Sequence, residues 1–153
     1  MCEVKGRKGL IIIFPQSNPE QYLLDKSFVG LEGEELKYAL TKPFITEIPL
    51  EIAIYYQDKE YNFVIPKGYD WNGANVPSFA WKIIGQQFDP RFKLASCVHD
   101  YLCENKEVIS HDRYLSTLVF EALCEYFGRF NNLKRFLMFH IVDNAQKFRD
   151  WRN

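Results

Sequence analysis

A histidine and an aspartate stand side by side in the stretch Leu94-Ala-Ser-Cys-Val-His-Asp-Tyr-Leu-Cys103. An imidazole beside a carboxylate can act as a general base, carry a proton or bind a metal ion. Apolar residues recur every three or four positions here, which predicts a helix with one apolar stripe. His99 falls at the edge of that stripe, and Asp100 lies further toward the polar side. His99 and Asp100 are the candidate catalytic residues; the plainer alternative is a half-buried histidine with one hydrogen bond.

A loop rich in turn-forming residues precedes this helix. Residues 65–78 combine glycine, asparagine and proline with two large aromatic side chains, which predicts a structured loop rather than a flexible linker. Asn72-Gly73 can adopt positive φ at low cost and present backbone N–H groups to an anion or a neighbouring helix. We expect the loop to fold over the imidazole at position 99, the alternative being a well-packed strand-to-helix connection. The candidate substrate-facing residues of the loop are Tyr69, Trp71, Asn72, Gly73 and Asn75.

The same helix also suggests a metal site. His99 and Cys103 are four residues apart, a spacing at which two ligands share one helix face. Asp100 is a further candidate ligand on the helix. Others would have to come from His111, Asp112 or Cys124. The sequence predicts no particular cofactor, and a divalent metal held by Asp100 and Cys103 is the one candidate.

Two known kinds of hydrolase share parts of this pattern. Cys97-Val-His-Asp-Tyr-Leu-Cys103 is similar to the helix of secreted phospholipases A2, which implies a histidine that activates water and an aspartate that holds calcium. The glycine loop such a site needs has one counterpart, Gly68 to Gly73, but the cysteine spacing does not match that family's disulfides. His-Asp phosphohydrolases need a histidine upstream, and His99 is the first in this chain. A hydrolase is thus predicted only in general terms, with His99 as base and Asp100 orienting it or a metal.

Composition limits the class of protein. The chain has 153 residues, of which 47% are hydrophobic and 25% charged, enough for one globular domain over 1–153. The net charge of −1 argues against nucleic acid as a partner. A modest basic end is explained by a solvated helix face and comprises Lys134, Arg135, Lys147, Arg149, Trp151 and Arg152.

The four cysteines form no CxxC pair, and no apolar run is long enough for a signal peptide or a membrane span. We therefore expect reduced thiols and a location in the cytoplasm of a host cell, with virion association as a further option.

The chain is predicted to place its strands early and its helices late. A short strand is expected at 10–14, and strands at 51–56 and 60–65 form a hairpin around the polar turn 57–59. Residues 16–42 are ambiguous: Pro19 can begin a short helix, and 34–40 is a helix or an extended segment. The fold class is therefore α+β, an N-terminal antiparallel hairpin or small sheet (about 1–66) followed by three to four helices (78–150). The expected helices are 79–84 capped by Ser78, 90–105 capped by Asp89, one from Ser110 or His111 to Phe127, and one from Asn131 or Asn132.

Three spaced motifs together resemble a known family. They are Val64-Ile-Pro-Lys-Gly-Tyr69, Trp71-Asn-Gly-Ala-Asn-Val-Pro77 and Ala95-x-x-x-His-Asp-Tyr-Leu102. In this order they resemble an uncharacterised family of phages and prophages, domain of unknown function 1353, over about 63–127. The resemblance implies a phage or prophage context and supplies no established activity.

This chain departs from the family pattern at several positions. The family's Asp is Asn72 here, its Ser is Asn75, and its Tyr after Leu is Cys103. A carboxylate on the following helix has no counterpart, since Ser116 or Thr117 falls near that place. If the family's acids bind metal or act in catalysis, the site has degenerated in this chain.

A non-enzymatic role is the alternative function. The chain would then be a phage component for virion assembly, or one that contacts a host protein or inhibits a host defence. His99 and Asp100 would pin the loop onto the helix through buried hydrogen bonds. An enzyme should place His99 in a water-accessible cleft with Asn72 or Tyr69 across it. An interaction protein should bury these groups and expose an apolar patch elsewhere.

Overall fold

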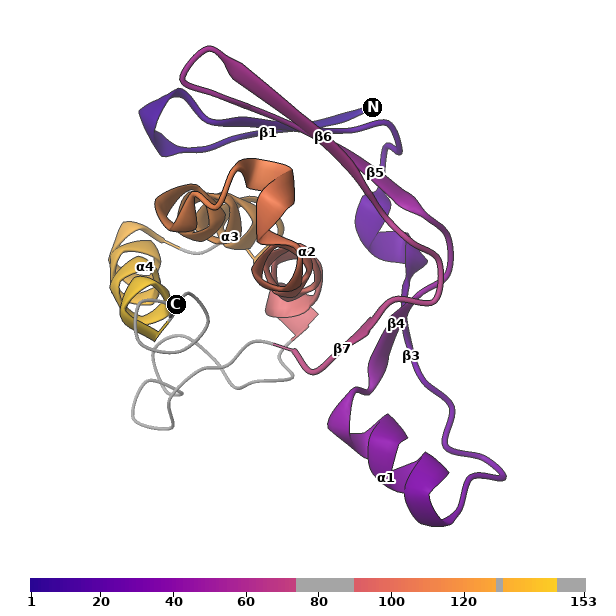
Figure 1. The fold of residues 1–153 in the computed structure, drawn as a ribbon. Coiled ribbons are helices and arrows are strands. Elements are labelled where there is room, and N and C mark those ends of the chain that lie inside the picture. Colours follow the sequence, from indigo (N-terminus) through magenta and orange to yellow (C-terminus); the bar gives the residue numbers. More distant parts are fainter. Residues whose placement is uncertain (74–89, 129–130, 146–153) are drawn as a thin grey trace.

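The computed structural model describes residues 1–73, 90–128 and 131–145. Strands occupy the N-terminal half of the chain, and the longer helices follow in the C-terminal half (Figure 1). The predicted α+β class is confirmed. The expected helix at 79–84, with its Ser78 cap, lies outside the described residues, as does Asp89.

A four-stranded antiparallel sheet forms one layer. It contains β1 (Cys2–Lys5), β2 (Ile11–Phe14), β5 (Leu50–Tyr56) and β6 (Lys59–Ile65) in the order β1-β2-β5-β6. Alternate residues of β5 are buried, as period-two side-chain alternation requires. The hairpin and its apolar face are confirmed, but the turn has two residues, because Tyr56 pairs with Lys59.

A second, three-stranded sheet was not predicted from the sequence. It joins β3 (Leu23–Asp25), β4 (Phe44–Thr46) and β7 (Asp70–Trp71) in that order. These strands are two or three residues long, too short to produce an alternating pattern. The helix α1 (Gly33–Thr41) connects β3 to β4 and lies away from the other helices (Figure 1).

The three later helices are α2 (Lys93–Glu104), α3 (Arg113–Gly128) and α4 (Asn132–Ala145). A 3₁₀ turn at Pro90–Phe92 precedes α2, so the helix begins later than expected. Helix α3 also begins later than predicted, because Ser110 and His111 both have positive φ. Asp112 caps α3 instead: its Oδ1 accepts a hydrogen bond from the Leu115 amide at 3.0 Å.

Helix α3 lies at the centre of the hydrophobic core. Every residue from 115 to 124 is buried, and α3 contacts α2, α4 and β1 (Figure 1). One of these residues is charged: the Glu121 carboxylate is held by Arg7 Nε at 2.8 Å. A buried carboxylate needs such a partner, since an unpaired charge in the core is costly. The ion pair therefore joins the β1–β2 connection to the helices.

Two further expectations can be compared with the structure. Cys2, Cys97, Cys103 and Cys124 are all free thiols. In the residues that the structure describes, no helix is both long and apolar enough to cross a membrane.

The second sheet is tied together by a partly buried ion pair. Lys26 Nζ lies 2.8 Å from Asp70 Oδ2, and the Tyr38 hydroxyl donates to Asp70 Oδ1 at 3.2 Å. Burial alone would raise the pKa of Asp70, but the bonds from Lys26 and Tyr38 outweigh it and hold this pKa below its usual value. The stabilisation is therefore present above the unfolded pKa of about 4 and is lost as pH falls through the folded value.

We predict that Asp70→Asn lowers the free energy of unfolding at pH 7 by about 1–3 kcal/mol. Wild type should lose more stability than this variant between neutral pH and about pH 3, so that the difference between them narrows. Urea unfolding across this pH range measures both effects, with the exposed Glu51→Gln as control. A constant difference at every pH would contradict the role given to Asp70.

Candidate functional site

Four of the polar or sulfur-bearing residues of α2 share one flank of the helix. Successive positions turn by about 100°, which places Ser96, His99, Asp100 and Cys103 within roughly one third of the helix circumference. Ser96 and His99 are buried, whereas Asp100 and Cys103 are half-buried. The flank therefore passes from the core to partial exposure.

The strand β7 is bonded directly to this flank. Trp71 Nε1 donates a hydrogen bond to Ser96 Oγ at 3.0 Å, and Ser96 Oγ donates to the Lys93 carbonyl at 3.1 Å. Trp71 is only 1% exposed, so its indole N–H depends on this partner. The bond fixes the chain before Asn72 beside the helix, one turn before His99.

Tyr69 attaches the same segment to the far end of α2. Its ring meets the edge of Tyr101 with centroids 5.5 Å apart, and its hydroxyl donates to Glu104 Oε2 at 3.1 Å. Burial raises the pKa of Tyr69 far above its usual value, and the charges of Glu104 and Asp100 raise it further. Tyr69 therefore remains protonated and acts as a hydrogen-bond donor, with the Asp100 carboxylate within electrostatic range.

His99 faces the α3 side. The side chain is 8% exposed, and its ring centroid lies 5.1 Å from that of Phe120. Cys103 Sγ is 3.9 Å from both Nδ1 and Nε2. Equal distances place the sulfur beside the ring rather than along one N–H direction. The imidazole is thus held between an aromatic ring and a thiol.

Asp100 points in a different direction from His99. Neighbouring positions on a helix do not face each other, so the carboxylate is directed about 100° away from the imidazole. Its charge raises the pKa of Tyr69 and, after the larger effect of burial, that of the Cys97 thiol. The two candidate catalytic groups therefore face opposite sides of the flank.

The predicted loop residues are found in part beside α2. Tyr69 and Trp71 contact the helix, Asn72 is exposed, and Gly73 is buried with φ +78°. The predicted positive φ is thus found at Gly73. Asn75 lies outside the described residues. Sequence reasoning missed the roles of Ser96 and Glu104, although Ser96 precedes His99 by one turn on the same face.

The remaining metal-ligand candidates do not gather here. Asp112 caps α3, His111 is exposed in the connection before it, and Cys124 is buried within α3. Across residues 1–73, 90–128 and 131–145, no three His, Cys, Asp or Glu side chains are grouped closely enough to hold a metal ion. His99 and Cys103 do lie together, as their spacing predicted.

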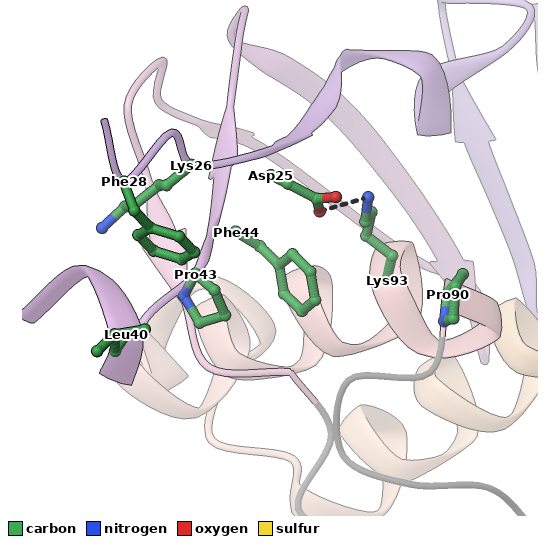
Figure 2. Close-up of a pocket in the computed structure, with 8 residues that line it drawn as sticks. All are labelled: Asp25, Lys26, Phe28, Leu40, Pro43, Phe44, Pro90 and Lys93. Atoms are coloured by element: carbon green, nitrogen blue, oxygen red, sulfur yellow. Dashed lines mark ion pairs between the residues drawn. The ribbon is translucent and has the colours of Figure 1, made fainter. Parts of the chain in front are cut away.

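An apolar pocket of about 400 Å³ lies elsewhere, between the β3–α1 region and the start of α2. Phe28, Leu40, Pro43 and Phe44 line it, and the Lys93–Asp25 ion pair (3.0 Å) crosses one side (Figure 2). Phe28 and Leu40 are 41% and 55% exposed. This pocket does not include His99.

The fold and site define an α+β protein in which a short strand is bonded onto a helix that carries a His-Asp pair. A family described as "Protein of unknown function (DUF1353)" matches residues 49–142, which include the hairpin, β7, α2, α3 and most of α4. The chain belongs to this family.

Part of the chain is also similar to a bacterial protein. The chain is 35% identical over 63 residues to "Uncharacterized protein y4jT" of Sinorhizobium fredii (strain NBRC 101917 / NGR234). The match covers 36% of this chain and 19% of the relative, so the chain spans less than a fifth of its length. No solved structure matches the chain.

We predict that Ser96→Ala lowers the free energy of unfolding by about 1–3 kcal/mol, because the buried Trp71 N–H loses its acceptor. In a Trp71→Phe background, which has no such donor, Ser96→Ala should lower the free energy of unfolding by much less. Urea unfolding of the four proteins gives the coupling energy. Ser116→Ala is the matched control, since that buried hydroxyl bonds the Arg113 carbonyl of its own helix. Additive effects of the two changes would contradict the assigned bond.

Proposed function

We propose that this chain is a phage or prophage protein with a hydrolase-like acid–base site on α2. The observation that carries the proposal is that a buried imidazole, His99, and a half-buried carboxylate, Asp100, are consecutive residues on the α2 flank to which β7 is bonded. A desolvated base beside a partly exposed charge is an arrangement that proton-transfer sites use. The phage context is supported by the motif resemblance, and location in the host cytoplasm or the virion belongs to the same proposal.

The two groups take separate roles in this proposal. His99 accepts a proton from water, while Asp100, within electrostatic range of Tyr69, binds a cationic group of the substrate or a divalent metal. Asp100 and Cys103 are three positions apart and are neighbours on the helix surface. Zinc accepts both carboxylate and thiolate ligands, so it is the metal that would suit this pair. Asn72 and the Gly73 amide would contact a polar group of the substrate.

The amide at position 72, where the motif resemblance implies an acid, supports a weakened hydrolytic activity in this chain. The motif resemblance implies a carboxylate where this chain has Asn72. An amide can neither accept a proton at neutral pH nor match a carboxylate as a metal ligand. The site proposed here is therefore a degenerate one. Restoring the acid should increase activity if the proposal is correct.

The test is hydrolysis of a panel of ester, phosphoester, peptide and glycoside substrates, with and without zinc. His99→Asn should lower the rate of hydrolysis about 100-fold or more without lowering the melting temperature. Asn72→Asp should raise the rate of hydrolysis. His111→Asn, at an exposed histidine, is the matched control and should change neither quantity. An unchanged rate in His99→Asn, or no hydrolysis by either wild type or Asn72→Asp, would contradict the enzymatic proposal.

A non-enzymatic phage component is the second candidate, and a specific observation favours it. His99 is 8% exposed and packed on Phe120, while Phe28 and Leu40 remain exposed at the apolar pocket of Figure 2. In this role His99 stabilises the fold. A phage or host protein then binds by placing an apolar side chain in this pocket. His99→Ala would then lower the melting temperature strongly, and the substrate panel would give no hydrolysis.

A further inference from the structure

A second pocket, of about 390 Å³, lies between the β1–β2 connection, α3 and α4. It shares no lining residue with the His99 flank or with the apolar pocket of Figure 2. Three basic side chains line it, Arg7, Lys8 and Arg135, together with two acidic ones, Glu121 and Asp143. Its walls combine charged groups with aromatic rings, which is a composition suited to an organic anion.

Arg7 is fixed in a geometry that leaves its outer edge available. Its Nε donates to the buried Glu121 carboxylate at 2.8 Å, and its guanidinium lies 4.9 Å from the Phe139 ring centroid. Within the described part of the chain, its two terminal nitrogens make no hydrogen bond, and the side chain is 37% exposed. A guanidinium held at Nε and stacked on a ring presents its terminal pair of N–H groups for bidentate binding of an oxyanion.

Lys8 supplies a second cation next to Arg7. It sits in a turn with φ +58°, and its ammonium lies 5.2 Å over the Tyr114 ring. No ion pair of Lys8 is found among residues 1–73, 90–128 and 131–145. The nearby acidic groups are engaged otherwise: Asp143 is paired with Arg113, and Glu121 is held by Arg7. Glu121 offsets the charge of Arg7, so Lys8 supplies the positive charge that has no acidic partner in the described part of the chain, and the terminal N–H groups of Arg7 supply donors for the same oxyanion.

Four aromatic side chains also line the pocket, Tyr114, Phe136, Phe139 and His140. Phe136 is 59% exposed and meets His140 with ring centroids 4.4 Å apart, and Tyr114 meets Phe139 at 5.7 Å. More than half of the Phe136 side chain is exposed, so part of its ring surface is open to a stacking partner. A flat ring placed there would bury apolar surface and contact the existing aromatic cluster.

We propose that this pocket binds a nucleoside monophosphate, with the phosphate on Arg7 and Lys8 and the base against Phe136. The phosphate monoester matches the Lys8 ammonium and the terminal N–H groups of Arg7, and the base matches the exposed ring of Phe136. A single nucleotide fits an isolated pocket of this volume, whereas a nucleic-acid strand would require a continuous basic surface. This binding site is independent of the proposed hydrolase-like site.

The test is isothermal titration calorimetry of the full chain with AMP, adenosine and ribose 5-phosphate. AMP should bind saturably, and each fragment should bind about tenfold more weakly, because it lacks either the phosphate or the base. Lys8→Gln and Phe136→Ala should each weaken AMP binding about fivefold. Both side chains are exposed, so the fold should be retained, and Lys59→Gln in the hairpin is the matched charge control.

Several outcomes would overturn this proposal. They are the absence of saturable AMP binding, equal binding of AMP and ribose 5-phosphate, and unchanged affinity in both pocket variants. An equal loss of affinity in Lys59→Gln would also overturn it, because the effect would then reflect net charge alone. Tight binding of single-stranded oligonucleotides with no binding of AMP would assign the pocket to a nucleic acid instead.

Discussion

A buried hydrogen bond, from the Trp71 indole N–H to the Ser96 hydroxyl, joins the second sheet to α2, and the Asp25–Lys93 ion pair (3.0 Å) joins the same sheet to the start of this helix. Strand β7 has only two residues, too few to keep its place by ladder hydrogen bonds alone. The indole contributes both a large buried surface and a directed donor, and a wrong position would leave that donor unpaired in the core. Tyr69 provides a second attachment through its hydrogen bond to Glu104, the last residue of α2. The chain at Asn72 is therefore placed beside the helix that carries His99 and Asp100.

Helix α3 imposes the complementary constraint. It is buried through ten consecutive residues and separates the α2 flank from the pocket between the β1–β2 connection and α4. Its one buried carboxylate, Glu121, must be neutralised, and Arg7 does so from the N-terminal part of the chain. The same ion pair that stabilises the core also orients the guanidinium that lines this pocket. Structure and candidate binding function thus depend on one pair of side chains at this end of the molecule.

The sequence predicted elements that are long and periodic. The hairpin at 50–65 and the helices α2, α3 and α4 follow from alternation and helical spacing. Helix α3 begins later than predicted, because Ser110 and His111 have positive φ. The second sheet was missed because its three strands are short and pair across long sequence separations. Neither β7 nor its bond to Ser96 leaves a local pattern.

The candidate site was predictable only in part. Residue types and spacing predicted His99, Asp100 and the loop before them as the candidate site, and these residues lie within the family match over 49–142. Spacing could not reveal that the imidazole packs on Phe120 or that the Asp100 carboxylate lies within electrostatic range of Tyr69, since Phe120 and Tyr69 belong to other parts of the chain. The pocket around Arg7 was not predicted either, because its residues come from three separate parts of the sequence.

The central claim is that the chain at β7 is fastened to α2 one turn before His99. Solution NMR of the Trp71 indole tests this claim most directly, through cross-relaxation of its Hε1 proton and the exchange of that proton with deuterated water. We predict cross-peaks from Trp71 Hε1 to the Ser96 β-protons and slow exchange of the indole proton. Rapid exchange without any contact to Ser96 would show that the loop and the helix are not joined, and would contradict the site described above.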